Sequence, residues 1–284
     1  MTALTYLTFA IGICPFVIGI GLLRRRLSAS ILKPSIQSIM LCTLAFNLTF
    51  FWQELWLVIP KAMTPGLHPI LFHNNHTWTG DNPLAELFQG TGALATMVSG
   101  LASSVALSRL TGERPTVRLF FYWMAFQGLY QSLTQVAIGA ILPGNDVGRA
   151  FAYLGLGHTA KLTLLGAAVL GMAFAGFWLA RRFPEAVTKG SHQGSPAIGS
   201  MILSAVVSVV LIVPFRVPRS PIEVVLVPLI INLIGSGWIA VGAALGKPKA
   251  NALTSTPSHL WEPIVALGLM LLIFQTVLRA GIKF

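Results

Sequence analysis

The chain has 284 residues, of which 55% are hydrophobic and only 10% are charged. Soluble domains carry about 25% charged residues, so this composition excludes an ordinary soluble domain and predicts a polytopic α-helical membrane protein. The net charge of +11 is no sign of a nucleic-acid partner, because no basic patch is interleaved with aromatic residues and membrane proteins collect basic residues in cytoplasmic loops.

Eight apolar stretches are long enough to cross a bilayer, which takes about 20 helical residues. We predict an all-α fold: a single integral membrane domain that forms a bundle of about eight transmembrane helices. The expected spans are approximately residues 5–23, 34–59, 83–107, 117–142, 158–179, 197–215, 222–245 and 260–278. A polar loop at about residues 60–82 separates the second span from the third.

The distribution of basic residues predicts the orientation of this bundle. The loops after the first, third, fifth and seventh spans contain 12 of the 19 Lys and Arg residues, and the opposite side contains six. Basic residues are enriched in cytoplasmic loops. We therefore expect both termini on the non-cytoplasmic side of a bacterial-type inner membrane, with the lipid bilayer as the surrounding partner.

Three of the six histidines lie close together in the polar loop. His68, His73 and His76 follow the second span, and neutral imidazole is a common ligand of zinc and other divalent transition metals. The segment is broken by Pro65, Gly66 and Pro69, so we expect a loop or re-entrant turn. A metal site and a hydrogen-bonded interfacial loop are both compatible with this pattern.

Glu54 is a carboxylate near the end of the second span. Such a group is unfavourable in a bilayer unless it is paired, protonated or in a wet cavity. It is a candidate general base, proton-relay group or ligand. The alternative is a span-end carboxylate that reaches the headgroups between Trp52 and Trp56.

Three glutamines follow one face of the fourth span. Gln127, Gln131 and Gln135 are four residues apart, which places them in line on a helix. They could line a polar cavity, with His158 nearby, or link neighbouring helices through hydrogen bonds.

A glycine-containing turn follows the fourth span. The residues Gly144-Asn145-Asp146-Val147-Gly148 predict a tight turn that presents Asp146 at the membrane surface. A short interfacial helix is expected after it, from about Ala150 to Leu156. Asp146 is a candidate catalytic carboxylate, and the alternative is a plain Asn-Asp turn between two helices.

Two of these segments resemble parts of the site-two-protease superfamily of intramembrane zinc metalloproteases. Residues Phe51 to Leu57 are similar to that family's zinc-binding helix, and residues Pro143 to Gly148 to its later Asp-containing turn. The resemblance implies that Glu54 is a general base. It also implies that Asp146 stands at the position of the family's third zinc ligand, an Asp. Gln53 and Leu57 replace the two histidines of HExxH, so the standard zinc site cannot form. The resemblance therefore implies a non-proteolytic or rewired relative.

Three classes of function stay open. The first is an accessory or assembly component of a membrane complex, with other integral membrane subunits as partners, and short loops and the lack of catalytic motifs favour it. The second is a membrane metalloenzyme with His68, His73 and His76 as ligands and Glu54 or Asp146 as base. The third is a small-solute transporter, although internal repeats typical of transporters are missing.

Overall fold

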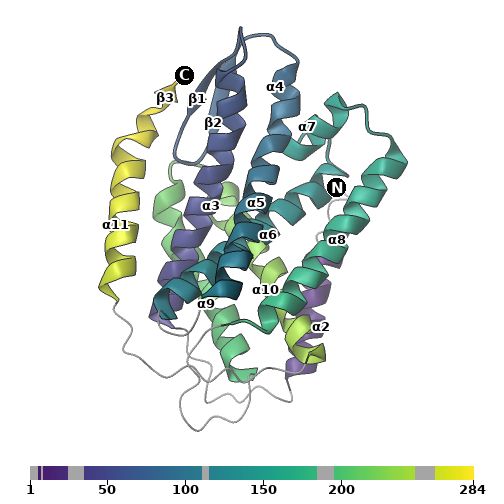
Figure 1. Cartoon of the computed structure of the whole chain (residues 1–284), viewed down its shortest axis with the longest axis vertical. Coiled ribbons are helices and arrows are strands. Elements are labelled where there is room, and N and C mark those ends of the chain that lie inside the picture. The colour runs from purple at the N-terminus through teal and green to yellow at the C-terminus, as the bar shows by residue number, and fades with distance from the viewer. Residues whose placement is uncertain (1–5, 8, 25–34, 111–114, 184–194, 247–259) are drawn as a thin grey trace.

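A computed structural model describes residues 6–7, 9–24, 35–110, 115–183, 195–246 and 260–284. In these residues, six helices are long and apolar enough to cross a membrane, and a shorter apolar helix covers Ala10–Leu23. This confirms the all-α class and supports a membrane protein (Figure 1). The number of spans and their orientation stay predictions. The longer helices are α3 (Ile36–Ala62), α5 (Thr91–Arg109), α6 (Pro115–Gly139), α8 (His158–Ala180), α9 (Ser195–Arg216), α10 (Val227–Leu245) and α11 (Trp261–Thr276).

Shorter elements extend or connect these helices. A π-helical turn leads into α2 and another into α10, and the last helix ends in a 3₁₀ turn. They are η1 (Phe9–Ile13), α2 (Cys14–Leu23), α4 (Leu84–Leu87), η3 (Phe88–Gly90), α7 (Asp146–Tyr153), η4 (Ile222–Leu226) and η5 (Leu278–Ala280). Each predicted span therefore has a helical counterpart, although α2 and α6 are not among the six described helices that are long and apolar enough to cross a membrane.

Helix α3 is the central element of the bundle. It packs against α5, α6, α9 and α11, and the side chain of Ser35 caps its first turn by accepting the backbone N–H of Ser38. The predicted end of this span at residue 59 is wrong, because α3 continues through Pro60 to Ala62. Proline cannot donate to the carbonyl four residues earlier. The hydroxyl of Thr91 lies 2.6 Å from that carbonyl, on Trp56, and 2.7 Å from the carbonyl of Phe88, so its one proton is shared between them and can replace the missing donor.

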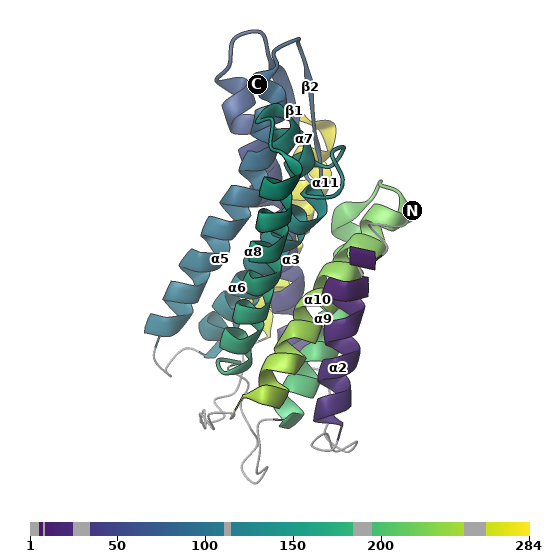
Figure 2. The same cartoon turned by 90° about the vertical axis from the view of Figure 1, so that its right-hand side faces the viewer.

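Glycines allow neighbouring helices to approach at backbone contact. Where α5 crosses α6, a side chain on Gly100 would meet the backbone of Gly128 and Leu129. A side chain on Gly242 of α10 would likewise meet the backbone of Gly176 on α8. Small residues at such crossings are the usual means of helix packing in membranes, and Figure 2 shows α2 lying alongside α10 at the edge of the bundle.

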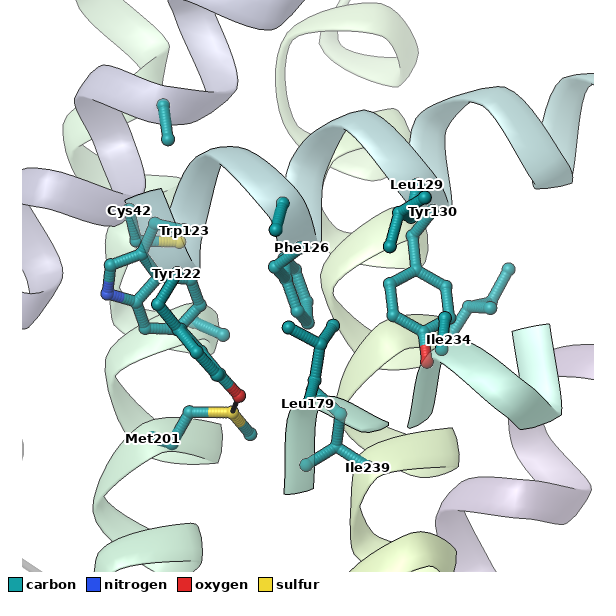
Figure 3. Close-up of a cluster of buried hydrophobic side chains, with 14 of the residues drawn as sticks. Cys42, Tyr122, Trp123, Phe126, Leu129, Tyr130, Leu179, Met201, Ile234 and Ile239 are labelled. Atoms are coloured by element: carbon teal, nitrogen blue, oxygen red, sulfur yellow. Dashed lines mark hydrogen bonds between the residues drawn. The ribbon is translucent and has the colours of Figure 1, made fainter. Parts of the chain in front are cut away.

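The apolar core is built around aromatic residues of α6. Tyr122, Trp123, Phe126 and Tyr130 are completely buried and follow one another along the helix (Figure 3). Their rings form edge-on and tilted pairs 5.3 to 5.6 Å apart. Aromatic pairs of this geometry add stability beyond the burial of their area, which gives α6 a fixed rotation in the bundle.

The histidine segment forms a small antiparallel sheet, which the sequence analysis did not predict. The strands are β1 (His68–Leu71), β2 (His76–Thr79) and β3 (Ile282–Lys283), in the order β2-β1-β3. A turn at Asn74–Asn75 joins the first two strands, and Phe72 donates its N–H to the carbonyl of Asn75. We call the end of the bundle that carries this sheet the hairpin end (Figure 1).

Helix α7 begins at this same end. Asn145 is its N-cap, and its side chain accepts the backbone N–H of Gly148 at 2.9 Å. The expected turn is confirmed, but the short helix starts at Asp146 rather than at Ala150. The cap fixes Asp146 in the first helical turn, where α7 packs against α4, η3 and α6.

Candidate functional site

The hairpin end contains a buried carboxylate–imidazole pair. Glu54 of α3 and His76 of β2 are 4% and 9% exposed, and Nδ1 of His76 lies 2.8 Å from Oε2 of Glu54. The carboxylate accepts, so the Nδ1–H of His76 donates. Nε2 of a neutral imidazole then carries a lone pair.

Donors surround this second ring nitrogen. Nζ of Lys61 and Nε2 of Gln89 each lie 3.4 Å from Nε2 of His76, which are long contacts. Lys61 is fully buried and donates to the carbonyl of Leu57 at 2.8 Å. Both neighbours therefore fit the tautomer in which Nε2 is the acceptor.

Trp78 closes the site on another side. Its ring stacks on His76 at 5.7 Å with an interplanar angle of 13°. The ammonium of Lys61 lies 4.7 Å from its centroid and the guanidinium of Arg149 lies 5.1 Å away. Cation–π contacts of this kind stabilise charges that are removed from water.

A second layer of charge comes from α4 and α7. Arg149 forms a two-pronged ion pair with Glu86, at 2.5 and 2.6 Å, and this pair raises the pKa of Arg149. Burial raises the pKa of Asp146, and the nearby carboxylate of Glu54 raises it further, against the opposite effects of His76 and Lys61. Asp146 is thus within electrostatic range of Glu54, although the two make no direct contact among the described interactions.

This arrangement suits proton transfer. A carboxylate that holds an imidazole in one tautomer leaves Nε2 able to accept a proton and return it, as in general acid–base catalysis and proton relays. The stacked tryptophan and the buried surroundings limit the access of water. We refer to Glu54, Lys61, His76, Trp78 and Asp146 as the acid–base cluster.

The structure separates the three predicted metal ligands. His68 is exposed, whereas His73 is buried on the other side of the turn with Nε2 3.1 Å from the carbonyl of Val217. Only His76 joins Glu54. Within the described part of the chain, no group of three or more His, Cys, Asp or Glu side chains is placed to hold a metal ion. His158 is also exposed, at the start of α8.

The glutamine face links helices, as one of its two interpretations predicted. Gln135 donates to Gln53 of α3 at 2.7 Å, and Gln131 donates to Gln127 at 3.2 Å. Gln127 in turn donates to Asn232 of α10 at 2.9 Å. These hydrogen bonds join α3, α6 and α10 inside the bundle.

Several members of the site are not predicted from the sequence. Lys61 lies seven residues after Glu54, on the same face two helical turns later. This spacing indicates that Lys61 lies near Glu54 only if the helix continues past Pro60, and the sequence predicts that the span ends there. Arg149, Gln89 and Trp78 gave no comparable signal, because each comes from a different segment and meets His76 or its neighbours only through the tertiary fold.

No family model, curated protein or solved structure matches this chain.

Proposed function

We propose that this chain is a multi-pass inner-membrane protein whose hairpin end faces the non-cytoplasmic side and works as an acid–base site. Glu54 and His76 are the proton-transfer pair, and Lys61 and Asp146 tune it. The buried 2.8 Å contact between Glu54 and His76 carries the proposal. Ionisable groups at membrane depth are functional candidates by default, because they are otherwise unfavourable.

The chemistry favours a membrane enzyme with proton transfer at His76. Glu54 orients the ring, and Nε2 takes a proton from a polar group that reaches it from the membrane surface. Similarity of residues 51–57 and 143–148 to the site-two-protease superfamily is in line with a base at Glu54, but the missing HExxH histidines do not support zinc-dependent proteolysis. A rewired metal site lacks an assembled ligand set in the described residues.

A genetic replacement tests this proposal without knowledge of the substrate. Glu54→Gln and His76→Gln, expressed at wild-type levels, are expected to reproduce the phenotype of a gene deletion in growth or in membrane-protein composition. Glu86→Gln is the matched control, because it removes a carboxylate at the same end whose partner is Arg149. Normal function of both Glu54→Gln and His76→Gln would contradict an acid–base role.

The second candidate is an accessory or assembly component of a membrane complex. Helix α11 supports it, because its side chains Val265, Leu269 and Leu272 are about half exposed and form an apolar face that another membrane subunit could cover. The same replacements distinguish the two candidates, since an accessory component tolerates Glu54→Gln whereas Leu269→Arg on α11 would abolish its assembly.

A further inference from the structure

Arg216 is a buried cation at the hairpin end that lies outside the acid–base cluster. It is 3% exposed at the end of α9, and among the described residues no carboxylate forms an ion pair with it. Its Nε donates to the backbone carbonyl of Glu223, and its guanidinium carbon lies 4.0 Å from the centroid of Phe50. Its Nη1 is buried without a hydrogen-bond partner, so a donor is available at this position.

The turn of the hairpin packs onto the same segment. Asn74 donates to the backbone carbonyl of Arg216 at 2.5 Å, and Nε2 of His73 donates to the carbonyl of Val217 at 3.1 Å. Nδ1 of His73 is buried and has no partner. Because Nε2 of His73 is the donor, its Nδ1 is an acceptor, so Nη1 of Arg216 is the unused buried donor here. Native proteins rarely leave such a donor unsatisfied.

The surrounding charge is positive. Burial lowers the pKa of His73 despite its hydrogen bond to Val217, and the charges of Arg279, Arg216 and Arg219 lower it further. Glu223 pairs with Arg219 at 2.9 Å. Three guanidinium groups thus act on one imidazole. The opposing carboxylates are Glu223, which pairs with Arg219, and Glu54, which is within electrostatic range of Arg216.

We propose that Arg216, Arg219 and Arg279 form a binding site for a phosphate-bearing anion, with the His73–Asn74 turn as its wall. Guanidinium groups match the geometry of phosphate oxygens better than other cations do. Val217, Val277 and Phe284 lie close in the chain to these arginines and are each at least 38% exposed. They offer an apolar surface beside the charges, so the phosphate belongs either to a lipid headgroup or to a free ligand.

Binding to the purified full-length chain in neutral detergent tests the site. The probes are inorganic phosphate, a short-chain phosphatidylglycerol and an uncharged diacylglycerol with the same acyl chains, measured by titration calorimetry. We expect Arg219→Gln combined with Arg279→Gln to weaken binding roughly tenfold or more, because charge-assisted hydrogen bonds are lost. Arg279 is exposed and Arg219 is half-buried, whereas Arg216 is 3% exposed, so the pair carries less risk of a folding defect than Arg216→Gln does.

Arg182→Gln is the matched control, since Arg182 is a surface arginine at the opposite end of the bundle that packs on Trp178. It is expected to bind as the wild type does. Binding of both phosphate and phosphatidylglycerol indicates a free phosphate ligand, and binding of phosphatidylglycerol alone indicates a lipid headgroup. No binding of either, or equal binding by the Arg219/Arg279 variant, overturns the proposal.

Discussion

At the scale of single residues, Asp146 shows how the acid–base cluster shifts a proton equilibrium. The side chain lies in the first turn of α7, where burial and Glu54 raise its pKa. The folded protein therefore holds a proton on this carboxyl more tightly than the unfolded chain does. The stabilisation that comes with protonation is complete below the unfolded pKa of about 3.9, and it is lost as the pH rises through the raised folded pKa.

Asp146→Asn should remove this pH dependence. We expect the variant to melt at a higher temperature than the wild type at neutral pH, and the difference to shrink toward pH 4. Thermal unfolding in detergent across this range measures the effect. Asp81→Asn, which changes an exposed carboxyl at the same end, serves as the control. A lower melting temperature of Asp146→Asn at neutral pH would speak against a buried, destabilised carboxylate.

Glu54 is expected to stabilise the fold through His76. Replacing it by alanine leaves the Nδ1–H of a buried imidazole without an acceptor, and the loss of such a partner costs about 1–3 kcal/mol. Equilibrium unfolding of Glu54→Ala and His76→Phe, alone and together, gives the coupling between them. Additive effects of the two changes would show that the 2.8 Å contact does not contribute to stability.

Residue identities alone predicted part of this site. Glu54 is a candidate because carboxylates are rare in apolar spans, and Asp146 because of its glycine-containing turn. The fold brings both into the cluster. The spacing of the three histidines is compatible with a shared metal site or with a hydrogen-bonded loop, and strand alternation and the turn direct the three side chains apart. Spacing along the sequence tells which way side chains point only when the secondary structure is known. The expected loop is in fact a pair of strands.

At the scale of elements, the continuation of α3 past Pro60 depends on a neighbouring helix. Trp56 is 38% exposed, and a backbone carbonyl without a donor is strongly unfavourable wherever water is excluded. Thr91 donates to it from the start of α5. The helix thus reaches Lys61 and places it beside His76.

Thr91→Val should destabilise the protein by roughly 1–2 kcal/mol, because the carbonyl of Trp56 loses its donor. In a Pro60→Ala background the backbone N–H of residue 60 can donate to the carbonyl of Trp56. Thr91→Val should then lower the free energy of unfolding by less than half as much. A double-mutant cycle from denaturant unfolding measures the difference. Equal costs in both backgrounds would contradict the assigned role of Thr91.

The hairpin has a position that only glycine can occupy. Gly80 adopts a φ of +109° at the end of β2, and a side chain there would collide with the carbonyl oxygen of Gly66. Gly80→Ala should therefore destabilise the hairpin by at least about 2 kcal/mol. Gly144→Ala, at a site with open space around it, should change little. Thermal melting of the two variants, with hydrogen exchange of the hairpin amides, tests this.

The elements were predictable to different degrees. Long apolar runs gave the positions of the helices because a bilayer demands about 20 residues per span, and η4 with α10 agrees at both ends with the predicted 222–245. The sheet was not predictable by the same argument. Its strands have four, four and two residues, and β3 pairs with β1 across most of the chain, which no local pattern records.

At the scale of the whole molecule, the described charges divide between the two ends of the bundle. Arg24 and Arg181 follow the ends of α2 and α8, and Arg109 is the last residue of α5; these three helix ends lie away from the hairpin end (Figure 1). The hairpin end also has basic residues, namely Lys61, Arg149, Arg216, Arg219, Arg279 and Lys283, so the orientation expected from the sequence stays a prediction. Other basic residues used in that argument, such as Arg25 and Lys247, lie outside the described residues.

Cysteine labelling in intact cells tests this orientation. In a background with Cys14 and Cys42 replaced by serine, His68→Cys should react with an impermeant maleimide, since residue 68 is exposed at the hairpin end. Ser108→Cys, exposed at the other end of α5, should react only after the cells are opened. The reverse pattern would place the hairpin end in the cytoplasm.

The order of strands in the sheet has a consequence for the biogenesis of the protein. Strand β1 is synthesised after α3, but its second neighbour, β3, comes after α11. Lys283 pairs with Ile70, and Phe284 donates to Pro69. The sheet can therefore be completed only after α11 has been synthesised, and until then β1 has only one of its two partner strands.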